Sequence, residues 1–203
     1  MHVREARIHA RVCSDGWVSE YIEKRVLQIV HGRRYHRDRR RYEVGYSNNE
    51  KTLLREFDED MKAVFGVRCK RNTGERRTKS KRIFTRLKKL GAGKSRAWFI
   101  PRAIAFGSRK IKRAWLTAFY DDEGWVEMRQ KRVGVGVVNK RGLKQAAKML
   151  KQLGIPHKLN GPYKNGVWTI SINRRGLARF KKIVGFHHIK KKAKLQKILR
   201  EKT

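Results

Sequence analysis

Two acidic residues of this sequence stand in the same local context. The motif Asp15-Gly16-Trp17-Val18 recurs as Glu123-Gly124-Trp125-Val126, half a chain length later. Each motif follows a segment with helical spacing of apolar residues, predicted as Glu5–Ser14 and Lys112–Asp122. A carboxylate at the C-terminal end of a helix opposes the helix dipole, so capping alone explains neither acid well. The pattern therefore indicates a duplicated unit with one chemically active acid in each copy.

The elements that must position these acids also repeat in order. After each motif we expect two strands, a helix, two more strands and a closing helix, with each motif's Gly ending the preceding helix in the left-handed conformation. The expected fold class is α+β, a pseudo-twofold tandem repeat of α-β-β-α-β-β-α units with two antiparallel sheets. The predicted strands are Val26–Val30, Tyr42–Tyr46, Val67–Lys70, Arg76–Lys79, Glu127–Arg129, Val133–Val138, His157–Leu159 and Val167–Ile172.

This order divides the chain into two repeats of similar length. Residues 1–98 form the first repeat, 99–112 a linker, and 113–203 the second repeat, which ends in a basic helix. The first repeat carries a basic insert at residues 31–41, between two strands, and the second repeat has no insert of that length.

The charge of the chain indicates a polyanionic partner. The net charge is +37, from 54 Lys and Arg against 17 Asp and Glu, and so large an excess would oppose folding without a counter-polyanion. We expect nucleic acid, no membrane partner and a cytoplasmic location, because no apolar run reaches the length of a membrane span. Cys13 and Cys69 are expected to be reduced, buried thiols. The composition also hints at an archaeal-like thermophile.

The helix before the second motif carries a family resemblance. The run Trp115-Leu116-Thr117-Ala118-Phe119-Tyr120-Asp121-Asp122-Glu123-Gly124 resembles the signature of LAGLIDADG homing endonucleases, and Ile8-His9-Ala10-Arg11-Val12-Cys13-Ser14-Asp15-Gly16 looks like its first copy. The resemblance is to the two-repeat, single-chain form, and so to a monomer. The sequence departs from the pattern at His9, Arg11 and Asp122. We expect Asp121 and Asp122 to be solvated or to serve packing.

The resemblance implies a site-specific double-strand DNA endonuclease that depends on Mg²⁺. It places Asp15 and Glu123 as metal ligands at two adjacent centres, which would cut the two strands across the minor groove. Divalent cations activate water in such hydrolysis, and Mg²⁺ accepts oxygen ligands. Lys81 and Arg174 are the implied basic residues near the scissile phosphates, with a plain backbone contact as the alternative for each.

The resemblance also implies that the two sheets form a saddle that reads DNA in the major groove. Outward strand residues are expected to read bases, Tyr42 and Glu43 among them, and the insert is expected to clamp phosphates or to enter structured RNA. The expected nucleic-acid contacts are Arg25, Gln28, Arg33, Arg34, Arg37, Arg39, Arg40, Arg41, Arg129, Arg132, Lys158, Lys164, Arg175 and Lys190. The pair His187-His188 is expected to pack or to contact phosphate.

The size of the charge keeps a second function open. A non-cutting RNA-binding protein on the same fold, such as a ribosome-associated component or an intron maturase, would use basic residues on every surface. Charge confined to the saddle favours DNA, whereas charge on the outer helices and the insert favours RNA. A transcription regulator on the same fold is a third possibility.

Overall fold

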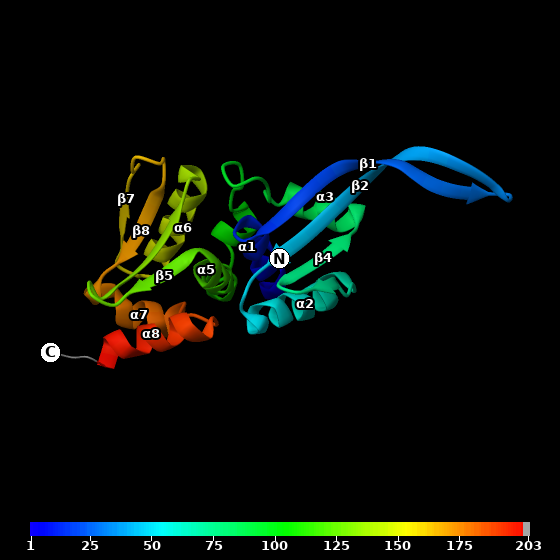
Figure 1. Ribbon diagram of the computed structural model, residues 1–203. Helices are drawn as coiled ribbons and strands as arrows, with labels where there is room; N and C mark the ends of the chain where they lie inside the picture. Colours follow the sequence, from blue (N-terminus) through cyan, green and yellow to red (C-terminus); the bar gives the residue numbers. More distant parts are fainter. Residues whose placement is uncertain (201–203) are drawn as a thin grey trace.

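A computed structural model describes residues 1–200 and shows the same seven elements, in the same order, in each half of the chain (Figure 1). The first repeat contains α1 (Val3–Cys13), β1 (Gly16–Val30), β2 (Arg33–Ser47), α2 (Lys51–Phe65), β3 (Lys70–Asn72), β4 (Glu75–Lys79) and α3 (Lys81–Lys89). The second contains α5 (Arg109–Glu123), β5 (Gly124–Glu127), β6 (Arg132–Val137), α6 (Lys140–Gln152), β7 (Lys158–Asn160), β8 (Trp168–Ile172) and α7 (Arg174–Ile183), followed by α8 (Ile189–Arg200).

The two sheets have the same topology. Their strand orders are β1-β2-β4-β3 and β5-β6-β8-β7, and every pairing is antiparallel. The register matches as well, since Trp17 pairs with Gly45 and Trp125 pairs with Gly134. The expected α+β fold with pseudo-twofold repeats is confirmed.

Each sheet buries one face against its own helices and leaves the other face open. Val44 and Tyr46 are fully buried on the inner face of the first sheet, where the Tyr46 ring lies 5.1 Å from that of Phe57 in α2. Val133 and Val135 are equally buried in the second sheet. Because side chains alternate along a strand, Trp17 and Trp125 belong to the opposite, open faces.

The glycines that face these tryptophans are required by close packing. A Cβ on Gly45 would lie 2.1 Å from the Trp17 ring, and one on Gly134 would lie 2.4 Å from the Trp125 ring. The motif glycines also allow close packing of the backbone, because a Cβ on Gly16 would lie 2.6 Å from the carbonyl oxygen of Gly45. Our expectation of a left-handed helix end was wrong for both motif glycines, since neither has positive φ and Gly124 is extended.

The first hairpin differs most from the sequence prediction. β1 and β2 are continuous strands of 15 residues each, so residues 33–41 of the predicted insert are strand and the hairpin turn lies at residues 31 and 32. Tyr42 was expected to point outward but packs inward, with its ring 5.1 Å from that of Phe84 in α3. The linker contains a short helix, α4 (Arg102–Ala105), that was not predicted, and α5 begins at Arg109, three residues earlier than expected.

Gly45→Ala tests the packing of the motif tryptophan. The added methyl would overlap the Trp17 ring, so we expect a loss of about 1–3 kcal/mol in the free energy of unfolding. Gly136→Ala is the matched control, because its nearest neighbour lies 3.2 Å away and can shift. Urea unfolding followed by Trp fluorescence measures both, and equal losses would contradict the explanation.

Candidate active site at the junction of the repeats

The helices that carry the two acids, α1 and α5, pack against each other (Figure 1). A buried hydrogen bond joins them where the first motif departs from the apolar pattern. Trp115 Nε1 donates to His9 Nδ1 at 3.0 Å, so the neutral ring donates from Nε2 to the carbonyl oxygen of Leu90 at 2.9 Å. Burial lowers the pKa of His9 to about 4, which keeps the ring neutral.

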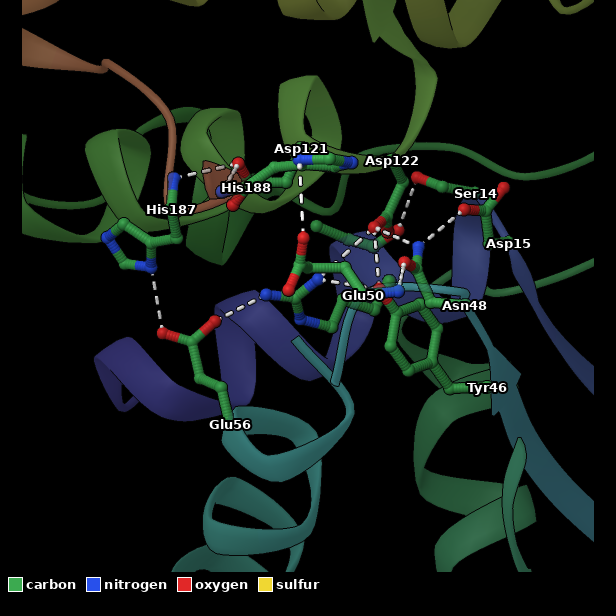
Figure 2. Close-up of polar contacts among 12 residues, drawn as sticks. Ser14, Asp15, Tyr46, Asn48, Glu50, Glu56, Asp121, Asp122, His187 and His188 are labelled. Atoms are coloured by element: carbon green, nitrogen blue, oxygen red, sulfur yellow. Dashed lines mark hydrogen bonds and ion pairs between the residues drawn. The ribbon is translucent and has the colours of Figure 1, made fainter. Parts of the chain in front are cut away.

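The other two departures from the pattern pair with each other. Arg11 and Asp122 have fully buried side chains and form an ion pair at 3.2 Å between Nη1 and Oδ1. Tyr46 accepts from Arg11 at 2.8 Å and donates to the same oxygen of Asp122 at 2.7 Å, and Arg11 also contacts Glu56 of α2 (Figure 2). Asp122 was expected to be solvated or to serve packing, and only the packing role holds, because its carboxylate is the buried partner of Arg11.

Asp121 fixes the chain segment that leads into α8. Its Oδ1 accepts the backbone N–H groups of His187 and His188 at 2.8 and 2.9 Å, and the side chain is buried (Figure 2). Glu56 reaches the same segment and accepts from His187 Nδ1 at 2.9 Å. Although burial of Glu56 acts in the opposite direction, His187, Arg11 and Arg7 together lower its pKa to about 2. Asp121 was also expected to be solvated or packed, and only the packing role holds.

The two motif acids lie at equivalent helix ends, and Glu123 feels the charge of Asp15. Asp15 follows α1 and accepts from Asn48 Nδ2 at 3.0 Å, whereas Glu123 is the last residue of α5. Burial raises the pKa of Asp15, and the nearby Lys191 and Asn48 oppose the rise. Burial and the negative charge of Asp15 raise the pKa of Glu123 to about 7. A cation beside the two carboxylates would favour their ionised forms.

A lysine from the last helix completes the site. Lys191 Nζ donates to the carbonyl oxygens of Asp121 and Asp122 at 2.5 and 3.0 Å, at the C-terminal end of α5. It borders a cavity of about 420 Å³ that is lined by Asp15, Ser47, Asn48, Asn49, Asp121, Asp122, His188 and Lys191. Sequence reasoning did not single out Lys191, because the run Lys190–Lys192 does not show which lysine turns inward.

Comparison with known proteins identifies the architecture. Residues 110–185 match the family model described as a LAGLIDADG-like domain. The homing endonuclease I-DmoI, in a complex with DNA and Mn, superposes with a TM-score of 0.65 and 16% identity over 90% of this chain and 96% of that chain. The chain has the two-repeat LAGLIDADG fold.

Two further structures share the LAGLIDADG fold at lower similarity. The homing endonuclease I-WcaI, bound to its DNA recognition sequence, has a TM-score of 0.55 and 11% identity over 90% of this chain and 80% of that chain. Full-length DUF199/WhiA from Thermatoga maritima has a TM-score of 0.55 and 12% identity over 98% of this chain and 61% of that chain. None of the curated proteins matches this chain in sequence.

The LAGLIDADG acids form a donor set that fits a magnesium ion. Carboxylate oxygens are the ligands that Mg²⁺ prefers, and it commonly keeps several waters beside one or two carboxylates. Within residues 1–200 no group of three or more His, Cys, Asp and Glu side chains is placed to hold a metal, so Asp15 and Glu123 would share the ion with water and phosphate. Burial and then the negative charge of Asp15 raise the pKa of Glu123, and a bound cation would favour its ionised form.

The structure does not bring Lys81 and Arg174 together with the acids. Gly16 pairs with Tyr46 of β2, and Tyr46 pairs in turn with Arg76 of β4. From Arg76, β4 runs three residues farther along the sheet to Lys79 before α3 begins. At about 3.3 Å per residue, Lys81 starts roughly 10 Å or more along the sheet from Asp15. Its ammonium group lies 5.5 Å from the Tyr42 ring. Arg174 begins α7 at the equivalent end of β8. A phosphate contact suits both positions better than a place at the acids.

The open faces carry several of the predicted reading residues. Register places Arg132 and Lys158 on the Trp125 face of the second sheet and Gln28 on the Trp17 face of the first. Three basic residues of that first face, Lys70, Arg77 and Lys79, were missed because their strands are short and carry no apolar alternation. Glu43 was expected to read bases, but its side chain is buried and accepts a hydrogen bond from Trp17 Nε1 at 3.0 Å.

The other predicted contacts outside β2 lie in turns, at a strand irregularity and at the starts of helices. Arg129 and Lys164 are exposed in the turns after β5 and β7, Arg25 lies at an irregularity in β1, and Arg175 and Lys190 are exposed at the starts of α7 and α8. Cys13 and Cys69 are buried free thiols, as expected. In the part of the chain that the structure describes, no helix is long and apolar enough to cross a membrane.

Removal of Arg11 tests the buried ion pair. Arg11→Met would leave Asp122 buried without its cation, and we expect a loss of about 3–5 kcal/mol in the free energy of unfolding. The double variant Arg11→Met/Asp122→Ala removes both charges and should recover much of that loss. Urea unfolding of the two single variants and the double variant gives the coupling energy. Simply additive losses would show that the two residues do not act as a pair.

Glu123→Gln tests whether burial and the charge of Asp15 destabilise the ionised carboxylate of Glu123. The pKa of Glu123 is raised from 4.5 to about 7 in the folded protein, so the folded state holds this proton to a higher pH than the unfolded state does. The stability that comes from this proton is present at low pH and is lost as the pH rises through 7. The uncharged Gln should therefore stabilise the metal-free protein by up to about 3 kcal/mol at pH 8 and by little near pH 4.

Thermal or urea unfolding at both pH values measures this effect. Glu59→Gln is the matched control, because it removes an exposed carboxylate of α2 that has no part in the site. An equal effect of Glu123→Gln at pH 4 and pH 8 would rule out the raised pKa.

Proposed function

We propose that this chain is a site-specific, metal-dependent DNA endonuclease of the homing type that cuts both strands of its target. The observation that carries this proposal is the pairing of Asp15 and Glu123 at equivalent helix ends, where Asp15 is exposed, Glu123 is half-buried and both have raised pKa values. A protein that only binds nucleic acid gains nothing from two carboxylates that repel each other beside a phosphate-binding surface. A nuclease needs them to hold its cations.

The surrounding residues suit this chemistry. Asp15 and Glu123 would hold Mg²⁺, which supplies an activated water and stabilises charge on the phosphate oxygens. Asn48 orients Asp15 through its hydrogen bond, and the positive charge of Lys191 opposes the upward pKa shifts of both acids. Lys191 therefore favours the ionised carboxylates that a metal needs. Structures of I-DmoI with DNA contain Mn, Mg or Ca.

The pseudo-twofold arrangement supports cleavage by a single chain. One acid from each repeat reaches the junction, so a monomer supplies two centres, one for each strand. The open sheet faces, with Lys70, Arg77, Arg132 and Lys158, would lie against the flanking DNA. Lys81 and Arg174, farther from the acids, would hold phosphates of the backbone.

One observation favours the second candidate, a non-cutting RNA-binding protein. The outer helices are strongly basic: exposed residues on α3, α6 and α8 include Arg82, Arg86, Lys88, Lys89, Lys140, Arg141, Lys144, Lys148, Lys151, Lys192, Lys194 and Lys197. Charge in these places does not contact a duplex on the saddle. Cosedimentation with ribosomes that persists in high salt, with no cleavage of DNA, would establish this function in place of the first.

The test of cleavage begins with a plasmid library that carries random inserts. We expect the protein to linearise a small set of plasmids in the presence of Mg²⁺, and sequencing of the new ends gives the target. On that target Asp15→Asn should abolish double-strand cleavage and leave binding, measured in Ca²⁺ by gel shift, within about threefold, because only the metal ligand is changed.

Glu59→Gln is again the control and should cut as the unmodified protein does. Unchanged cleavage by Asp15→Asn would refute the assignment of this acid. Failure of the unmodified protein to cut any member of the library would refute the proposed function.

A further inference from the structure

The hairpin of β1 and β2 extends far beyond the first sheet as a free two-stranded arm (Figure 1). We call residues 20–42 the arm. The pairing of β2 with β4 ends at Glu43 and Lys79, and beyond that level β2 pairs only with β1, from Glu20 and Tyr42 to Val30 and Arg33. In the second repeat the equivalent strands, β5 and β6, have only 4 and 6 residues. The arm is therefore a feature of one side of the molecule.

Register divides the arginines of the arm between two faces. The odd-numbered residues of β2 share the open face with Gly45 and Glu43, so Arg33, Arg37, Arg39 and Arg41 lie on the continuation of the saddle surface. Arg34 and Arg40 lie on the opposite face, among the exposed side chains of Ile22, Leu27 and Ile29.

A bulge in β1 preserves this division along the arm. Lys24 and Arg25 together face Asp38, whose Oδ1 accepts the backbone N–H of Arg25 at 3.0 Å. After the bulge the open face of β1 carries Val26, Gln28 and Val30, while β2 keeps its alternation unbroken. The arginine face therefore runs from the sheet to the tip.

The arm has the dimensions of a groove-binding ribbon. From Tyr42 to Arg33 the strand advances nine residues, about 30 Å, which equals the length of roughly nine base pairs of B-DNA. The major groove of B-DNA admits a two-stranded ribbon, whereas the deep, narrow major groove of A-form RNA does not. Gln28 and Tyr35, which pair with each other on the open face, could reach base edges.

We propose that the arm lies with its arginine face in the major groove of the DNA beyond the saddle, and that it lengthens the recognised site by about nine base pairs on the side of the first repeat only. This inference rests on the proposed binding of a DNA duplex across the two sheets. It does not depend on cleavage.

The first experiment compares hydroxyl-radical footprints on the selected target, in Ca²⁺, for the full chain and for a shortened chain in which an Asn-Gly turn replaces residues 24–38. We expect the full-length footprint to extend about nine base pairs farther from the centre on one side. In the shortened chain most of that extension should be lost, with the other side unchanged. A symmetric footprint, or one unaffected by the shortening, would overturn the proposal.

The second experiment tests the face of the arm and does not shorten the chain. Arg37→Gln/Arg39→Gln removes two charges from the open face, and Arg34→Gln/Arg40→Gln removes two from the opposite face. Loss of two phosphate contacts should reduce the slope of log affinity against log salt by about 2 for the first variant, with less than half that change for the second. Equal changes would overturn the proposal.

Two outcomes separate this inference from the function. A one-sided footprint from a protein that cuts no target would support the arm and refute the nuclease. Cleavage with a symmetric footprint would support the nuclease and refute the role of the arm. Loss of affinity for structured RNA alone, on shortening the arm, would overturn the assignment of DNA as its partner.

Discussion

The buried contact of Arg11 with Asp122 joins the two repeats at the junction that carries the two motif acids. Arg11 lies about one helical turn before Asp15, and Asp122 directly precedes Glu123, so the ion pair sets the separation of the two acids. Tyr46 and Glu56 complete the partners of Arg11. A buried pair of charges contributes little net stability, but it penalises every docking of the helices that separates the charges. The contact thus specifies one arrangement of the repeats.

That arrangement brings two carboxylates to the same junction, and neighbouring residues offset the cost of keeping both ionised. Burial and like charge raise the pKa of Glu123, while Lys191 and the hydrogen bond from Asn48 act in the opposite direction. Lys191 can do so only because Asp121 anchors the backbone at His187 and His188 and thereby fixes the start of α8. The last helix is in this sense part of the site, although it lies outside the repeated unit.

The sequence was sufficient for the order of elements and for the two acids, because local periodicity and a repeated motif encode both. It was insufficient for the partners of Arg11, His9 and Lys191, which come from positions 35 to 111 residues away. His9 and Arg11 looked like departures from an apolar pattern until their partners were in view. The role of the motif glycines was misjudged for the same reason, since the atoms that exclude a Cβ there belong to another strand or an earlier helical turn.

The symmetry of the molecule fits the proposed function. Cutting two strands would require two equivalent centres, and the motif tryptophans and the sheet topology are alike in both repeats. Recognition of a base sequence carries no such requirement. The arm appears in one repeat and a basic helix, α8, follows the other, so the two sides can contact flanking nucleic acid differently. The arm and α8 add positive charge on unequal parts of the molecule, and through Lys191 the charge of α8 also acts on the paired acids.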